Sequence, residues 1–116
     1  MNRLTLALGV ALATLVAAAP VAARPTTAAA TTVTVQMKEF KFILSKKTVP
    51  HGTVTFKLVN KGTIKHDFKI AGKKSKLIAK GKSGTLTVTL KKGTYPYLCT
   101  VPGHAAAGMK GKLKVT

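Results

Sequence analysis

The strongest constraint on this 116-residue chain is a repeated alternation of apolar and polar side chains from residue 33 onward. A period of two places successive side chains on opposite faces of a β-strand. Turn signals at Pro50–Gly52 and Asn60–Gly62 separate the alternating runs. The apolar members of these runs are Val33, Val35 and Met37; Val54, Phe56 and Leu58; Leu86, Val88 and Leu90; and Leu113 and Val115. We therefore predict an all-β fold, an antiparallel β-sandwich of about six to eight short strands.

Two segments modify this simple pattern. The alternation shifts face near Lys38 and Glu39, which indicates a bulge or bend at that point. Further along, the pattern predicts a strand over 64–70 that points His66 inward and Asp67 outward. The predicted inward neighbours of His66 are Ile64, Phe68 and Ile70. A buried imidazole among apolar side chains needs a partner, because an unpaired polar group is costly to bury. Either a hydrogen bond or a metal ion meets that need.

The only cysteine of the chain lies close to two other metal-binding side chains. Four residues separate Cys99 from His104, and four more separate His104 from Met109. A thiolate, an imidazole and a thioether suit copper better than a hard cation, which prefers carboxylates. Two histidines and a cysteine with a weak axial methionine form a blue-copper electron-transfer site, and His66 is the candidate for the second histidine. The alternative is structural, because free cysteine and methionine also serve as apolar core residues.

These residues resemble those of the cupredoxin family of small blue copper proteins, which includes plastocyanin, azurin and auracyanin. The run Cys99–His104 is similar to azurin ligand loops, and Asn60–Phe68 is similar to the first-histidine segment of the family. The spacing from His104 to Met109 is closer to that of auracyanin and plastocyanin. The resemblance covers residues 33–116 and implies a Greek-key sandwich with one type 1 copper ion. The implied ligands are His66, Cys99, His104 and Met109.

Two neighbours of these residues bear on how the site is held. Cupredoxins commonly have an asparagine after the first histidine, whereas this chain has Asp67. A carboxylate accepts backbone N–H groups but lacks the amide donor, so the bracing role of this position is open. Thr100 either braces the loop through its hydroxyl or is an ordinary surface residue.

The chain divides into three parts. Residues 1–23 have the pattern of an export signal, with a basic start at Arg3, a long apolar run and small residues at 21–23. We expect cleavage after residue 23 and a periplasmic or extracellular protein, although retention as a membrane anchor is the alternative. Residues 24–32 are a low-complexity, flexible lead-in. Residues 33–116 form a single copper-binding domain.

The charge of the chain is strongly one-sided, with 20 Lys and Arg against 2 Asp and Glu, a formal net charge of +18. Such a field favours anionic partners, namely an acidic cytochrome, an acidic membrane oxidase domain or an anionic surface. The alternative is a lysine coat that keeps the protein soluble. We expect no specific nucleic-acid binding, because only Tyr95 and Tyr97 lie close together and no aromatic stacking platform is evident. We also expect a monomer.

We interpret the chain as an electron carrier and not as an enzyme. Three histidines are too few for the additional copper centres of an oxidase, and His51 lies in a turn where we expect it to be exposed. A single aspartate supports no Ser-His-Asp triad. The alternatives are a protein for copper storage, delivery or resistance, and a basic polyanion-binding module with a vestigial cupredoxin fold. Copper delivery usually uses exchangeable sites rich in Met and His, so one Cys-His-His-Met set favours electron transfer.

Overall fold

The computed structural model describes residues 9, 11, 13–14 and 30–116. Most of the predicted signal peptide and most of the lead-in therefore lie outside the described residues. All regular structure in the described part is β-strand, which confirms the all-β prediction. The strands are β1 (Thr31–Lys38), β2 (Lys41–Leu44), β3 (Thr48–Val49), β4 (Gly52–Asn60), β5 (Lys69–Ile70), β6 (Lys73–Lys74), β7 (Ser83–Leu90), β8 (Gly93–Leu98) and β9 (Lys110–Val115).

Strand β1 begins at Thr31, so it includes two residues that the sequence pattern places in the lead-in. Among the described residues, no helix is long and apolar enough to cross a membrane.

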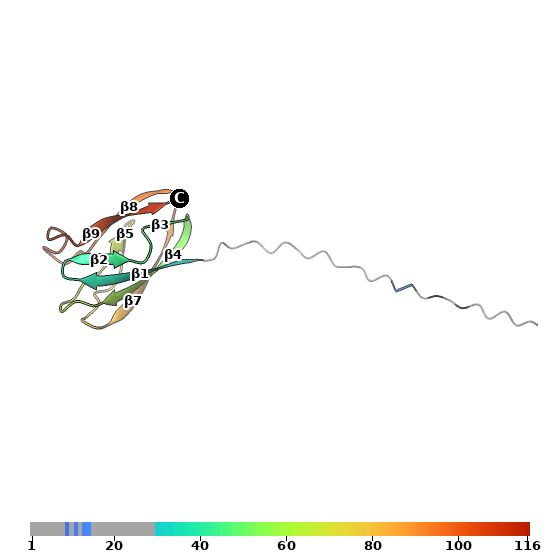
Figure 1. The fold of residues 1–116 in the computed structure, drawn as a ribbon, viewed down its shortest axis with the longest axis horizontal. Helices are drawn as coiled ribbons and strands as arrows, with labels where there is room; N and C mark the ends of the chain where they lie inside the picture. Colours follow the sequence, from blue (N-terminus) through green and yellow to red (C-terminus); the bar gives the residue numbers. More distant parts are fainter. Residues whose placement is uncertain (1–8, 10, 12, 15–29) are drawn as a thin grey trace, which may run out of the picture.

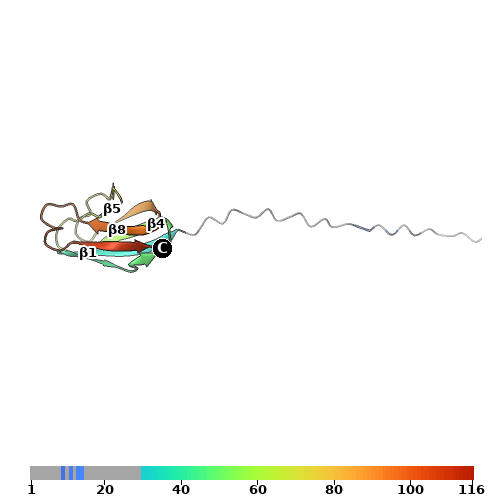
Figure 2. The same cartoon turned by 90° about the horizontal axis from the view of Figure 1, so that it is seen from above.

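The strands form the two layers of a sandwich (Figures 1 and 2). The first sheet has the order β2-β1-β4-β7, and the second has the order β3-β9-β8-β5-β6. The predicted antiparallel pairing is present in most strand pairs, whereas β1 runs parallel to β4 and β3 runs parallel to β9. The chain leaves the first sheet after β2, adds β3 to the second sheet and returns as β4. Because of this crossover, β4 lies beside β1 and runs in the same direction. The alternation of residues within a strand does not specify which strand becomes its neighbour.

The core lies between the two sheets and consists of the inward members of the alternating runs. Val33, Val35 and Met37 of β1 are fully buried, as the period of two predicts. Two aromatic rings join the layers, because the centroid of the Phe68 ring lies 5.0 Å from that of Phe56. Aromatic pairs at this distance contribute about 0.5–1.5 kcal/mol beyond the area that they bury.

The bulge or bend predicted near Lys38 and Glu39 is a tight turn, at which the chain reverses direction. Strands β1 and β2 form an antiparallel hairpin in which Lys38 lies opposite Lys41. Alternation continues on the return strand of a hairpin, so the same pattern of residues fits a bulge or a tight turn. The turn at Glu39 and Phe40 therefore projects from one end of the sandwich.

The predicted strand over 64–70 is only partly present. His66 forms a single antiparallel bridge to Ile78, and regular pairing begins only at β5. His66 is fully buried as predicted, but Ile64 is 44% exposed and Asp67 is 1% exposed, the reverse of the predicted orientation. Period-two alternation requires a continuous ladder, and side-chain hydrogen bonds replace that ladder here.

Asn60 at the end of β4 provides several of these bonds. Its Nδ2 donates to the carbonyl oxygens of Ile64 and Ile78 at 2.8 Å each, and its Oδ1 accepts from Gly62 N at 2.9 Å. The Asn60 side chain is thus buried and fully bonded, and it fixes the path of the chain as it approaches His66.

Candidate metal centre

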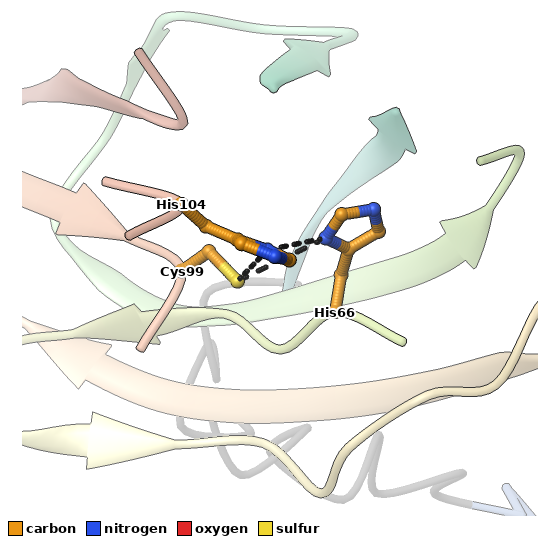
Figure 3. Close-up of side chains that lie close together, drawn as sticks. All are labelled: His66, Cys99 and His104. Atoms are coloured by element: carbon orange, nitrogen blue, oxygen red, sulfur yellow. Dashed lines mark hydrogen bonds between the residues drawn. The ribbon is translucent and has the colours of Figure 1, made fainter. Parts of the chain in front are cut away.

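Three of the predicted metal ligands meet at one end of the sandwich, where their donor atoms point toward one another (Figure 3). His66 precedes β5, Cys99 follows β8, and His104 lies in the loop between β8 and β9. The Nδ1 atoms of the two histidines are 3.1 Å apart. Cys99 Sγ lies 3.6 Å from His104 Nδ1 and 4.0 Å from His66 Nδ1. The fold therefore brings together side chains that are 33 and 38 residues apart in sequence.

These separations, 3.1 to 4.0 Å, lie within about 0.2 Å of those expected around a single metal ion. Metal–nitrogen and metal–sulfur bonds of about 2.0–2.3 Å place the donors of one tetrahedral or trigonal ion about 3.3–3.8 Å apart. All three side chains are buried, and the most exposed of them, His104, retains 7% of its surface. Two imidazoles and one thiolate in a buried cluster match the preferences of copper.

The state of the His66 ring suits metal binding. Its Nε2 is buried without a hydrogen-bond partner, and Glu39 Oε1 lies 3.4 Å away, close enough for attraction but outside hydrogen-bond geometry. A proton on Nε2 faces this carboxylate and leaves the lone pair of Nδ1 directed at Cys99 and His104. Burial also lowers the pKa of His66, which keeps the ring neutral and able to bind a metal.

Glu39 also holds the chain segment that carries His66. Its Oε1 accepts from Thr63 N at 2.6 Å, Thr63 Oγ1 at 3.0 Å and Ile64 N at 2.9 Å. These bonds, the one from Thr63 N first, lower the pKa of Glu39 to about 2. A Cβ atom on Gly62 would lie 2.6 Å from the same carboxylate, so only glycine lets the group pack this closely on the backbone. The β1–β2 turn is thereby joined to the His66 segment.

Asp67 joins the same segment to the cysteine loop. Its Oδ1 accepts from Thr100 N at 2.6 Å, and its Oδ2 accepts from the Thr100 hydroxyl. The bracing role of this position is therefore filled by a carboxylate, and Thr100 braces the loop rather than lying free on the surface.

The Cys99 thiol is neutral in the metal-free protein, because burial raises its pKa. Binding of a metal as thiolate must therefore displace a proton.

Backbone hydrogen bonds shape the loop between Cys99 and Met109. His104 N donates to Val101 O, Met109 N donates to His104 O, and Cys99 N donates to Met109 O, each at 3.1 Å. Met109 is fully buried at the end of this loop. Its role as axial ligand stays a prediction.

Phe40 packs against the other histidine. Its ring meets the His104 ring edge-on, with the centroids 5.0 Å apart. Gly108, at a φ of 118°, lies close to the same turn, because an added Cβ would be 3.3 Å from Phe40 O. Phe40 itself is 40% exposed, so it lies between His104 and solvent.

Sequence reasoning placed His51 correctly and missed two residues of the site. His51 is exposed as predicted, with its Nδ1 3.0 Å from Thr116 O, and does not belong to the cluster. Glu39 and Phe40 were not singled out, because nothing in the sequence places a turn after β1 against His66 and His104. The one available signal was the rarity of acidic residues, since Glu39 and Asp67 are the only two in the chain.

We predict that Glu39→Gln destabilises the metal-free protein in a pH-dependent way. Since the folded pKa of about 2 lies below the ordinary 4.5, ionised Glu39 stabilises the fold above pH 4.5. This stabilisation is lost as the pH falls from 4.5 toward 2. Denaturant unfolding should therefore show a deficit for Glu39→Gln at neutral pH that shrinks on acidification. The exposed neighbour Lys41→Gln serves as control, and a deficit that is constant across this range would contradict the prediction.

Comparison with known proteins agrees with this geometry. The sequence matches the family model of the cupredoxin-like domain over residues 5–115. Auracyanin-B of Chloroflexus aurantiacus is 60% identical over 37 residues, which are 31% of this chain and 16% of that protein. This chain thus matches only a small part of the length of that relative.

Solved structures share the fold over a larger part of the chain. An auracyanin B structure has a TM-score of 0.67 and 26% identity, covering 75% of this chain and 89% of the other. Reduced auracyanin from Roseiflexus castenholzii has a TM-score of 0.65 and 30% identity, and the match covers 75% of this chain and 98% of that one. Auracyanin A of Chloroflexus aurantiacus, described as a "blue" copper protein, has a TM-score of 0.62 and 28% identity. The match covers 73% of this chain and 98% of that one. With the family match over residues 5–115 and a buried His-Cys-His donor set, this chain belongs to the cupredoxin family of blue copper proteins.

Proposed function

We propose that this protein carries single electrons between redox partners through one type 1 copper ion. His66, Cys99 and His104 supply the close ligands and Met109 the weak axial one. The observation that carries the proposal is the convergence of the first three donors within 4.8 Å of one another in a buried cluster. Copper in such a site supplies one-electron chemistry, since it alternates between two oxidation states.

The surroundings of the donors support electron transfer rather than catalysis. Three close ligands and an axial thioether leave no open position for a substrate. Glu39 and Asp67 hold the ligand-bearing segments by hydrogen bonds, so the donors need little movement when the charge of the ion changes. Burial of all three donors also disfavours ready exchange of the metal, which argues against storage or delivery.

The end of the sandwich near His104 is the proposed route for electrons. His104 retains a small exposed edge beside the half-exposed ring of Phe40. Pro102, Ala106 and Ala107 are exposed in the same loop, so the surface here is apolar and built of small side chains. Such a surface lets a redox partner approach closely without desolvating charges.

The charge and the N-terminal segment support two further parts of the proposal. Without residues 1–23, which contain Arg3, the chain keeps 19 basic and 2 acidic side chains, a net charge of +17. The proposed partner is therefore an acidic cytochrome or an acidic domain of a membrane oxidase, steered by this field. The export pattern of residues 1–23 supports action in the periplasm or outside the cell.

We predict that the copper-loaded, oxidised protein is intensely blue and that Cys99→Ala abolishes this colour. The band arises from charge transfer between thiolate and copper, so it requires the Cys99 sulfur. A visible absorption spectrum tests this. His51→Ala removes an exposed histidine outside the cluster and should leave the band intact. Survival of the band in Cys99→Ala would refute the site assignment.

We predict that Met109→Leu keeps copper and colour but raises the reduction potential. Loss of a thioether donor disfavours the oxidised ion more than the reduced one. The expected rise corresponds to at least a tenfold shift in equilibrium, or about 59 mV for one electron. Met37→Leu, at another fully buried methionine, should leave the potential unchanged in voltammetry. Loss of copper binding in Met109→Leu would contradict a weak axial role.

We predict faster electron transfer to acidic than to basic cytochromes, with the difference fading as salt rises. The lysine field raises the encounter rate with a negatively charged partner, and added ions screen it over about 8–10 Å. Stopped-flow rates over a salt series measure the effect. Equal rates with both kinds of cytochrome, insensitive to salt, would leave the lysines as a solubility coat.

A further inference from the structure

The outer face of the second sheet carries an ordered group of lysines. We call Lys69, Lys74, Lys110, Lys112 and Lys114 the lysine face. Lys110, Lys112 and Lys114 alternate along β9 and are all exposed, as the sequence predicts. One row of paired residues crosses β6, β5, β8 and β9. In this order its members are Lys74, Lys69, Leu98 and Lys110. Neighbouring strands lie about 4.8 Å apart, so Lys69 and Lys74 are adjacent charges, and Lys110 lies two strands from Lys69.

The lysine face has no counter-ions within the protein. The only acidic residues of the chain, Glu39 and Asp67, are engaged by Thr63 and Thr100. In residues 30–116, the only contact within salt-bridge distance joins Glu39 to His66. Like charges directly opposite each other, as at Lys69 and Lys74, destabilise a sheet. The fold therefore tolerates a repulsion that an external anion would relieve.

The charge is not spread evenly over the two sheets. The outer face of the first sheet carries one pair of facing lysines, Lys38 and Lys41 at the β1–β2 turn, and otherwise mostly hydroxyl side chains. Its rows across β1, β4 and β7 are Thr32, Thr55 and Thr87; Thr34, Lys57 and Thr85; and Gln36, Val59 and Ser83. A coat needed only for solubility would not require this difference between the two faces.

An apolar hollow of about 260 Å³ lies beside the lysines. Tyr95, Pro96 and Leu98 of β8 line it together with Lys69 and Ala71. Ammonium groups thus surround a small surface that an uncharged group can contact. Tyrosine is common where one side of a residue meets an apolar phase and the other meets water.

We propose that the lysine face docks the protein on an anionic lipid bilayer, with the lysines against the headgroup phosphates and the hollow against the interfacial layer. Every basic residue in the described part of the chain beyond residue 30 is lysine. Lysine acts as a mobile point charge, and protein–protein interfaces are depleted in lysine and enriched in arginine. A fluid lipid surface, by contrast, needs no fixed pairing geometry, and each nearby lysine strengthens its binding.

This orientation leaves the proposed electron route free. Strands β8 and β9 run along the length of the sandwich, whereas the loop between them lies at its end (Figure 2). A protein lying on its lysine face would therefore present Phe40 and His104 sideways, toward partners on the same membrane. The docking itself does not depend on copper, so it stands or falls separately from electron transfer.

The test is cosedimentation of the full chain with vesicles, using metal-free and copper-loaded protein. One set of vesicles is phosphatidylcholine alone, and the other has equal parts of phosphatidylcholine and phosphatidylglycerol. The triple variant Lys110→Gln, Lys112→Gln, Lys114→Gln should lower partitioning to the anionic vesicles by at least about tenfold, since each lysine contributes about fivefold. The control triple Lys41→Gln, Lys57→Gln, Lys80→Gln removes the same charge from exposed positions elsewhere and should lower it less than about threefold.

Each outcome decides the proposal. The proposal is supported if binding to anionic vesicles, with and without copper, falls when the lysine face is altered. Binding that all variants show to both kinds of vesicle is subtracted as background. Equal losses in the two triples would show that only net charge matters and would overturn it. The membrane proposal would also be overturned if the protein bound anionic vesicles no better than phosphatidylcholine vesicles but bound poly-glutamate through the lysine face. The partner of the lysine face would then be an acidic protein. In each case the circular dichroism spectrum of the metal-free variants reports whether the domain is folded, independently of copper.

Discussion

The hydrogen bonds from Thr100 to the Asp67 carboxylate connect the two parts of the chain that carry the donor cluster of His66, Cys99 and His104. They join the residue after His66 to the residue after Cys99, across 33 positions of sequence. Glu39 adds a second connection, from the β1–β2 turn to the loop before His66. The chain has only two acidic side chains, and both hold segments that carry a residue of the donor cluster.

Burial makes this cluster costly without a metal and stable with one. His66 keeps a buried Nε2 without a hydrogen-bond partner, and the Cys99 thiol has a raised pKa because it is desolvated. A cation that binds only the folded state adds stability by mass action, and a bond to the Cys99 sulfur would compensate for the desolvation of that group. Rigid positioning and metal-linked stability therefore have the same origin, since both follow from placing polar donors inside an apolar sandwich.

The use of both acidic residues at the site also explains the state of the surface. No carboxylate is left to neutralise the lysines of β5, β6 and β9, so the outer face of the second sheet carries a net field. That field acts on whatever anionic surface or protein approaches, whereas the end of the sandwich near His104 is apolar and built of small side chains. In the proposed function, charge orients and accelerates the encounter with a partner, and the uncharged end sets the distance for electron transfer.

The sequence alone determined the all-β class, the inward residues of β1, β4 and β9, and the three donors that meet in the cluster. These features are local: period two reports which side of a strand faces the core, and the ligand types report which metal they favour. Only the tertiary structure decided the parallel pairing of β1 with β4, the inward turn of Asp67, and the contacts of Glu39 and Phe40 with the two histidines. Hydrogen bonds between distant loops fix those features, and no repeat or spacing along the chain encodes such bonds.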